Sequence, residues 1–324
     1  MPKIQPAVQT LHYRLPGSSE SGYIDLAESL SIANRRFYRQ GMQYTIAGIS
    51  LYNGADINGR VLVEKLPTTW PSSNAWMKAF SAWNRQQLDA IADSDSESAL
   101  AGFRDFKIYA DAAHMTSHVS GTSNLLPQQS ALLGTGGTTD PLVGEWEYSQ
   151  IVLPNTLADA SGSLVDPLEY YMYMVGANRT GPGKGIIDGY QASRAFPQSP
   201  DPDAPALGSV DNWIRAMFDT GNDSGEAAEN ASDKNDQLPY DQDDYPGSQL
   251  QFPNLQLHDM IDITTTTVGG HSTMKGGVFP CGLLKVHKEQ GALGSDTATN
   301  VLDVLIHLVP GTRRGYLMEP MQDM

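Results

Sequence analysis

The sequence has little cysteine, no long apolar run and no secretory signal, and each shortage excludes a class of protein. Cys281 is the only cysteine among 324 residues, which rules out an internal disulfide framework, and its apolar neighbours predict a small buried side chain. No apolar run approaches the roughly 18 residues of a membrane-spanning helix. The first residues, Met-Pro-Lys-Ile-Gln-Pro, lack the charged-then-apolar pattern of a signal peptide. We expect a soluble protein made in a reducing compartment.

Recognisable signatures of catalysis are also missing. The sequence contains no Gly-x-Ser-x-Gly elbow, no Cys/His dyad and no paired-carboxylate motif. His114 and His118 have the spacing of two metal ligands on a helix, but no Glu follows His114, so we expect a polar surface turn. The run Gly181-Pro-Gly-Lys-Gly185 lacks the spacing of a P-loop and is expected to be a loop. The sequence therefore predicts a protein that is not an enzyme and has no cofactor.

Basic residues are scarce. The chain has 21 Lys and Arg against 37 Asp and Glu, a net charge of −16, and residues 1–33 contain only Lys3 and Arg14. Between Asp201 and Asp244 lie twelve acidic and two basic side chains, a net −10. We expect a solvated acidic loop there. The alternative is a Ca²⁺ or Mg²⁺ site at a subunit interface, although no complete calcium-loop motif is present.

Alternation of apolar and polar residues predicts about eight or nine strands. The expected strands are 7–14, 22–33, 43–52, 59–65, 103–109, 146–153, 261–268, 277–287 and 300–309. One helix is expected near 72–92, with Trp76, Phe80 and Trp83 on a buried face, and a short helix at 167–175. Many strands with 31 Gly and 20 Pro predict an all-β fold, a single jelly-roll sandwich. The expected domain covers residues 1–324, with an insertion at 176–250 and a docking peptide at 310–324.

The densest positive run is Asn34-Arg35-Arg36-Phe37-Tyr38-Arg39-Gln40. One interpretation is a solvated turn. The other is a DNA-binding patch in which Arg35, Arg36 and Arg39 bind phosphate while Phe37 and Tyr38 stack on unpaired bases. Both interpretations stay open at this point.

The C-terminal peptide is rich in apolar side chains: Tyr316, Leu317, Met318 and Met321. Such side chains are unfavourable in water, so the peptide must be buried against its own body or against a neighbouring subunit. We predict that these four residues form a subunit interface.

Three blocks carry a family resemblance: Lys65-Leu-Pro-Thr-Thr-Trp70, Phe103-Arg-Asp-Phe-Lys-Ile-Tyr-Ala-Asp111, and the tail from Leu305 to Met321. Together they resemble the capsid proteins of small circular Rep-encoding single-stranded DNA viruses. The resemblance implies a jelly-roll subunit that assembles with itself, on the order of 60 copies, into an icosahedral shell around a circular single-stranded DNA genome. It also implies a virion protein, assembled inside the host cell, with no membrane partner. The alternatives are a secreted or surface β-sandwich module that binds carbohydrate and Ca²⁺, and a jelly-roll enzyme.

Overall fold

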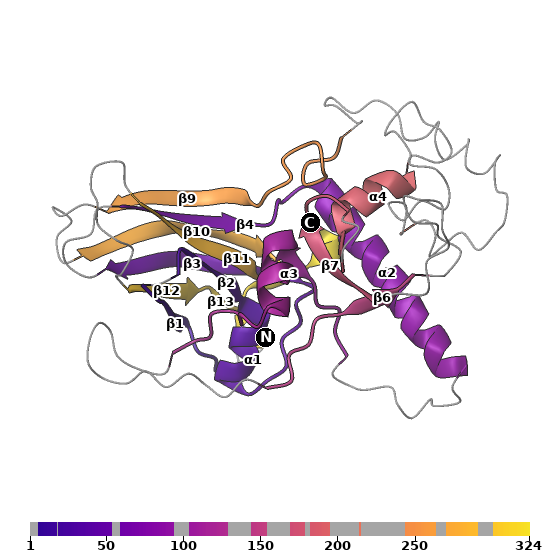
Figure 1. Cartoon of the computed structure of the whole chain (residues 1–324). Helices are drawn as coiled ribbons and strands as arrows, with labels where there is room; N and C mark the ends of the chain where they lie inside the picture. Colours follow the sequence, from indigo (N-terminus) through magenta and orange to yellow (C-terminus); the bar gives the residue numbers. More distant parts are fainter. Residues whose placement is uncertain are drawn as a thin grey trace. The chain divides into compact units, whose positions relative to one another are not determined.

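A computed structural model describes residues 6–17, 19–53, 59–93, 104–128, 144–153, 169–178, 182–194, 214, 244–263, 270–290 and 301–324. Its strands are β1 (Thr10–Leu15), β2 (Ser21–Asp25), β3 (Met42–Asn53), β4 (Gly59–Lys65), β5 (Tyr109–Asp111), β6 (Gln150–Val152), β7 (Glu169–Val175), β8 (Gly183–Gly185), β9 (Gln256–Ile263), β10 (His271–Pro280), β11 (Leu283–Gln290), β12 (Leu302–Leu308), β13 (Pro310–Arg313) and β14 (Met318–Pro320). Its helices are α1 (Leu26–Asn34), α2 (Trp70–Asp93), α3 (Ala112–Val119), α4 (Ile186–Arg194) and the 3-10 helix η4 (Met321–Asp323). Strands in mostly antiparallel sheets dominate and helices are few, which is consistent with the predicted all-β sandwich (Figure 1).

The chain divides into two compact units. Unit 1 comprises the described parts of 1–66, 117–147 and 256–321, and unit 2 those of 67–116, 148–255 and 322–324. The elements of unit 2 are therefore inserted, in sequence, between β4 and β9 of unit 1. The expected organisation, one domain with an insertion at 176–250, stays a prediction, because most of that insertion lies outside the described residues.

Unit 1 consists of two antiparallel sheets. Sheet A has the strand order β1-β12-β3-β10, with β14 also paired to β3, and sheet B has the order β2-β11-β4-β9. Representative pairs are Ile306↔Ile49 in sheet A and Val286↔Val63 in sheet B. Along the chain, β1 to β4 alternate between sheets A and B, and β9 to β12 alternate between B and A.

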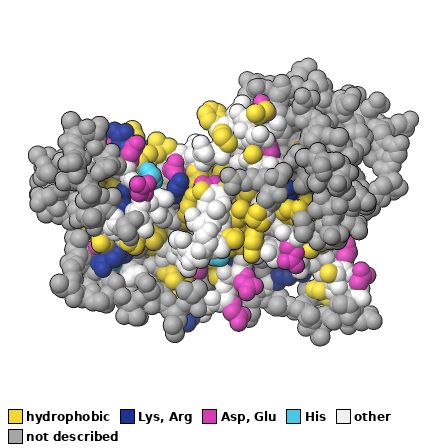
Figure 2. Space-filling view, in the orientation of Figure 1, with side chains coloured by type: hydrophobic (Ala, Val, Ile, Leu, Met, Phe, Trp, Pro, Cys, Tyr) yellow, Lys and Arg dark blue, Asp and Glu magenta, His cyan; other side chains and the backbone are white. Residues whose placement is uncertain are grey.

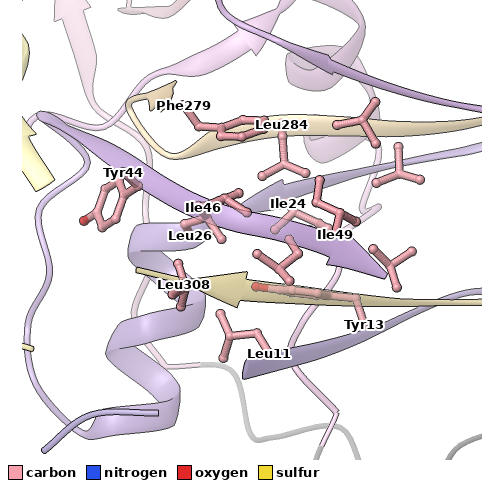
Figure 3. Packing of buried hydrophobic residues seen from close by; sticks show 14 of the residues in the cluster. Leu11, Tyr13, Ile24, Leu26, Tyr44, Ile46, Ile49, Phe279, Leu284 and Leu308 are labelled. Carbon is pink, nitrogen blue, oxygen red and sulfur yellow. The ribbon is translucent and has the colours of Figure 1, made fainter. Parts of the chain in front are cut away.

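The core of unit 1 lies between these sheets. Figure 3 shows Tyr13, Ile46 and Ile49 of sheet A extending toward Ile24 and Leu284 of sheet B. All five side chains are almost completely buried. Burying a side chain of this size contributes about 1.5–3 kcal/mol relative to leaving it exposed. Because alternate residues of a strand point to opposite faces, the period-two pattern of the sequence is the direct source of this core.

One lateral side of the sandwich, formed by β1 and β2, is covered by residues 125–128. The N–H of Gln128 donates to the carbonyl of His12 in β1 at 2.6 Å, and the N–H of Leu125 donates to the carbonyl of Tyr23 in β2 at 2.8 Å. An uncovered edge strand presents backbone groups that another chain can pair with. Residues 125–128 satisfy two of those groups and join the edges of both sheets.

The edge strands β9 and β10 are joined by side chains. An imidazole nitrogen of His258 in β9 lies 3.0 Å from the carbonyl oxygen of Lys275 in β10. The N–H of Lys275 donates to the Asp259 carboxylate, also at 3.0 Å. These contacts occupy backbone groups of β10 that would otherwise be available for strand pairing.

The second strand is shorter than the sequence predicted. The predicted strand 22–33 ends at Asp25, and α1 follows it. The Asp25 carboxylate accepts N–H bonds from Ala27 at 2.9 Å and Glu28 at 3.3 Å, which is the arrangement of a helix N-cap. The strand prediction beyond Asp25 was wrong because the apolar residues there also fit a helical period, and the capping Asp decides between the two.

The predicted strand 277–287 is two strands in different sheets. A turn separates β10 from β11, with the N–H of Gly282 donating to the carbonyl of Phe279 at 3.1 Å. Pro280 stands at the second position of this turn, and Cys281 has φ 56° at the third, as in a type II turn. Pro280 was the available signal, since proline is disfavoured inside a strand. Cys281 is fully buried, which confirms that prediction.

Several other elements differ from their predicted bounds. Of residues 104–109, the described part of the segment 103–109, only Tyr109 lies in a strand, and the strand expected at 146–153 is reduced to β6. The segment 167–175, expected to be a short helix, contains β7, because a continuous apolar run fits a buried strand as well as a helix. The strand predicted at 261–268 already begins at Gln256. The predictions for β3, β4, β12 and α2 are confirmed to within a few residues.

Unit 2 contains α2, α4 and a sheet in which β7 pairs with β5, β6 and β8. Trp76 and Trp83 of α2 are 8% and 6% exposed, and Phe80 is half-buried between them. All three rings contact Phe106, at centroid distances of 5.4–5.8 Å. The prediction that this face of α2 is core is therefore confirmed for both tryptophans.

Candidate nucleic-acid interface

The predicted DNA-binding residues lie directly after α1. The helix ends at Asn34, and Arg35 follows it as C-cap in the left-handed conformation, with φ 52°. Arg35 and Arg39 are exposed, while Arg36 is half-buried with its guanidinium 3.4 Å from the carbonyl of Pro6. Cations at this end of a helix are favoured by the helix dipole. A structural role therefore accounts for part of the charge of this segment.

The C-terminal hairpin supplies two more arginines. Arg313 of β13 pairs with Tyr316 across a loop of only two residues, Arg314 and Gly315. Both loop residues have positive φ, 51° and 101°, as a type I′ turn requires. Asn, Asp or Gly is usual at the first of these positions, so Arg314 occupies it at some cost in strain.

Two hydrogen bonds join this hairpin to the segment after α1. The Tyr38 hydroxyl donates to the carbonyl of Arg314 at 2.9 Å, and the Arg314 guanidinium donates to the carbonyl of Phe37. The rings of Tyr38 and Tyr316 meet edge to face, with centroids 5.6 Å apart. The five arginines brought to this region of unit 1 are called the arginine patch: Arg35, Arg36, Arg39, Arg313 and Arg314.

The electrostatics of the arginine patch favour an anion. Among the described residues, no carboxylate forms an ion pair with Arg35, Arg313 or Arg314. Burial raises the pKa of the Tyr38 hydroxyl, and the nearby Arg36 partly offsets this. Burial likewise raises the pKa of Tyr316 to about 12. Both phenols therefore stay neutral near pH 7 and add no negative charge to the patch.

The two aromatic candidates have different surroundings. Tyr38 is only 1% exposed, so its ring has no free face for a nucleic-acid base. Phe37 is half-buried and lies under the Arg39 guanidinium, 5.9 Å from its ring centroid. Phe37 is therefore the more accessible of the two rings, and base stacking requires an accessible ring. Tyr38 instead has a structural role, fixing the hairpin that carries Arg313 and Arg314.

The predicted interface residues of the tail are placed mostly inside unit 1. Tyr316, Met318 and Met321 are 1%, 6% and 0% exposed, and β14 pairs with β3 through Met318↔Tyr44. The Tyr316 hydroxyl donates to the carbonyl of Val8 and accepts a bond from the Asn34 amide. Leu317 alone is substantially exposed, at 43%. Of the two ways to bury the tail, docking against its own body accounts for three of the four residues, and Leu317 stays a predicted interface residue.

The other motifs of the sequence form no site in the described residues. The segment around His114 is the helix α3 and not the expected surface turn, and His114 is buried, with its Nδ1 accepting the N–H of Ala110. Lys184 of the glycine-rich run is buried in β8, where a loop was expected. Among the described residues, no group of three or more His, Cys, Asp or Glu could hold a metal ion. Most of the acidic segment 201–244 lies outside those residues.

Sequence reasoning missed the contribution of Arg313 and Arg314. They lie more than 270 residues from Arg36 along the chain, and no local pattern links the two segments. The one available signal was the pair itself, since adjacent arginines are uncommon in so acidic a chain. Arg14, one of the two basic residues of the N-terminal segment, lies in β1 with its guanidinium 2.9 Å from the buried carboxylate of Asp303.

Charged side chains of both signs are interspersed with hydrophobic ones on the face of the described residues that Figure 2 shows. None of the described helices combines the length and the apolar character of a membrane span. Comparison of the chain with family models, curated proteins and solved structures finds no match. The assignment of a function therefore depends on the strand order of unit 1 and on the arginine patch.

Proposed function

We propose that this chain is the structural subunit of an icosahedral viral shell that encloses circular single-stranded DNA. The subunit would be a non-enzymatic jelly roll, present in the virion at on the order of 60 copies and assembled inside the host cell. Each subunit would bury enough surface against its neighbours to close a shell, and it would present positive charge to the DNA.

The strand order of unit 1 carries the proposal. Counting β1 to β4 and β9 to β12 as the first to eighth strands, sheet A has the order 1-8-3-6 and sheet B has the order 2-7-4-5. The pairs 1-8, 2-7, 3-6 and 4-5 are those of one long antiparallel ribbon, rolled so that successive pairs fall in alternate sheets. This strand order is the one expected of a jelly roll, an architecture found in viral capsid proteins, lectins and cupins, and it supports the proposal.

The sequence blocks and the insertion favour the capsid function among these three. The blocks at Lys65–Trp70, Phe103–Asp111 and Leu305–Met321 resemble capsid proteins. Unit 2 is inserted between the fourth and fifth strands, so the eight-strand framework is kept intact while one connection is enlarged. Such an insertion gives a shell subunit additional surface for contacts without altering the sandwich.

The arginine patch supports single-stranded DNA as the partner. Guanidinium groups bind phosphate in a forked geometry, and five in one region neutralise several phosphates. We place this patch on the inside of the proposed shell and the acidic segment 201–244 on the outside, because a net −10 per subunit facing DNA would repel it. Five arginines neutralise only part of the packaged charge, so Mg²⁺ or polyamines would supply the rest.

Light scattering after size-exclusion chromatography, with electron microscopy of the same fractions, tests the shell directly. Closed particles of many tens of subunits support the proposal. A protein that stays monomeric under all assembly conditions contradicts it. A small oligomer that binds carbohydrate only with Ca²⁺ present would favour the β-sandwich binding module instead.

A further inference from the structure

The outer face of sheet A presents imidazoles and bases but no exposed carboxylate on its four long strands. Because alternate residues of a strand point to opposite faces, the outward positions lie between the buried core residues. On β1, β12, β3 and β10 these positions hold three histidines and two bases: His12, His271, His307, Arg14 and Lys275. The single outward carboxylate, Asp303, is completely buried, with the Arg14 guanidinium 2.9 Å away. At the β10 edge, the Lys275 ammonium lies 3.9 Å from Asp259 of β9. Both bases are thus paired, and the four strands expose no negative charge.

The outer face of sheet B carries more acidic groups. Its outward positions include three acidic residues, of which Asp262 and Glu289 are exposed and Glu64 is half-buried. Within the described strands, sheet A has one exposed carboxylate, Glu319, and only on the short strand β14. Exposed carboxylates repel a polyanion. Of the two outer faces, that of sheet A is therefore the one that a nucleic acid can approach with less repulsion.

The outer face of sheet A adjoins the arginine patch. β1 begins and β12 ends at the same end of the sheet, where the Thr10 hydroxyl lies 3.2 Å from Nδ1 of His307. Two residues before β1, the N–H of Val8 donates at 2.9 Å to the side chain of Asn34, the last residue of α1. Beyond β12 the chain continues into β13, which ends at Arg313. The arginines that follow α1 and β12 are thus placed at one end of this face.

An aromatic pair occupies the opposite end of the same face. Tyr52 of β3 and His271 of β10 are partners in the strand register, and their ring centroids lie 4.7 Å apart. His271 is exposed and Tyr52 is half-buried. The pair shares its row of the sheet with Asp303, four residues from His307 and so about 14 Å from the patch end. Proteins bind single strands by combining basic groups with aromatic rings on which bases stack, and a four-stranded sheet face can present such rings.

We propose that single-stranded DNA crosses the subunit along the outer face of sheet A, with its phosphates on the arginine patch at one end and a base stacked on Tyr52 and His271 at the other. This inference rests on the proposed function, because it takes single-stranded DNA as the partner. It adds an orientation, in which sheet A faces the DNA and the outer face of sheet B faces away from it. It also separates two contributions to affinity: the patch binds phosphate and is sensitive to salt, whereas the aromatic pair stacks on a base and is not.

Ultraviolet crosslinking of the isolated full-length subunit to oligothymidylate, followed by mass spectrometry of the crosslinked peptides, tests the location. We expect crosslinks in peptides of β3 and β10 as well as in those of the arginine patch, and none in peptides of β4 and β11 on sheet B. Crosslinks confined to the patch, or equally frequent on both sheets, overturn the inference and leave the proposed function standing. The absence of any crosslink would overturn single-stranded DNA as the partner, and the inference with it.

His271→Ala is the informative variant, because His271 is exposed and its loss leaves the core intact. At pH 8 it should weaken oligothymidylate binding about fivefold or more, the effect of losing one stacked base. The dependence of binding on salt should stay the same, because no phosphate contact is lost. The matched control, His287→Ala on the outer face of sheet B, should leave the affinity unchanged. Tyr52→Leu removes the other ring of the pair. Unchanged affinity in both His271→Ala and Tyr52→Leu overturns the proposal.

Discussion

The Tyr38 hydroxyl donates a hydrogen bond to the main-chain carbonyl of Arg314 at 2.9 Å, across 276 residues of sequence. This contact brings the end of the chain to the segment after α1 and makes one patch from two groups of arginines. The buried Tyr38 thus fixes the hairpin that carries Arg313 and Arg314 beside the segment after α1. The proposed DNA-binding patch therefore depends on this hydrogen bond as much as on the arginines themselves.

Arg35 is expected to reduce stability while it serves binding. A non-glycine residue in the left-handed region costs about 1 kcal/mol, and Asn tolerates that region better than Arg. Arg35→Asn should therefore raise the free energy of unfolding by about 0.5–1 kcal/mol and weaken binding to single-stranded DNA. Chemical denaturation and filter binding measure the two effects.

Arg313→Asn is the matched control for that variant, because Arg313 lies in a strand without positive φ. It should weaken DNA binding in the same way but give no gain in stability. Equal changes in stability for both variants would show that backbone strain at Arg35 has no part in the effect.

Removal of the C-terminal peptide should damage the fold and not only assembly. Deleting residues 315–324 exposes the core positions that Tyr316, Met318 and Met321 fill. The milder change Tyr316→Phe deprives the Asn34 amide and the Val8 carbonyl of a partner and should cost about 1–3 kcal/mol. Circular dichroism during urea unfolding measures both. A truncated chain with the parent's midpoint would mean that the tail docks on a neighbour and not on its own body.

The alternation of apolar and polar residues predicted the strands in which one face is buried and the other is exposed to solvent. β4 was predicted at its observed bounds because Val61 and Val63 alternate with more exposed neighbours. β7 was misread because its residues from Tyr170 to Val175 form an apolar run without alternation. The arginine patch was predicted only in part, since the approach of Arg314 to the segment after α1 is a tertiary contact. The hydrophobic periodicity of a segment predicts its secondary structure. The residues that meet in the arginine patch are determined instead by contacts between segments far apart in the sequence.

Trp83→Ala should destabilise unit 2 by about 3–5 kcal/mol, the usual cost of truncating a large buried aromatic side chain. Trp83 is 6% exposed and contacts Phe106, whereas Leu88 on the same helix is 41% exposed. Leu88→Ala is the matched control and should cost less than about 0.5 kcal/mol. Thermal and urea unfolding measure the loss of stability in the two variants. Equal losses would refute the assignment of Trp83 to the core.

Global stability should fall as pH rises through the range in which Asp25 loses its proton. Burial, followed by the neighbouring charge of Glu28, raises the pKa of Asp25 from an ordinary 3.8 to about 7, so between these values the folded state binds a proton that the unfolded state does not. The free energy of unfolding should decrease by about 1.4 kcal/mol per pH unit in that window and then stay level.

Urea unfolding of the parent and of Asp25→Asn at pH 5 and pH 7.5 isolates this contribution, because other titrating groups cancel in the difference. The difference between the two proteins should change by about 3 kcal/mol in favour of the variant at the higher pH. An unchanged difference would mean that Asp25 ionises in the folded chain near its ordinary pKa.

Nuclease protection shows whether the proposed shell encloses single-stranded DNA and whether the arginine patch holds it. Particles assembled with circular single-stranded DNA are treated with nuclease, and the DNA that sediments with them is measured, for the parent and for a variant in which all five patch arginines are replaced by Gln. We expect the parent to protect the circle, and the variant to form particles that protect much less of it. DNA degraded in the presence of closed parent particles, or equal protection by the variant, would contradict it.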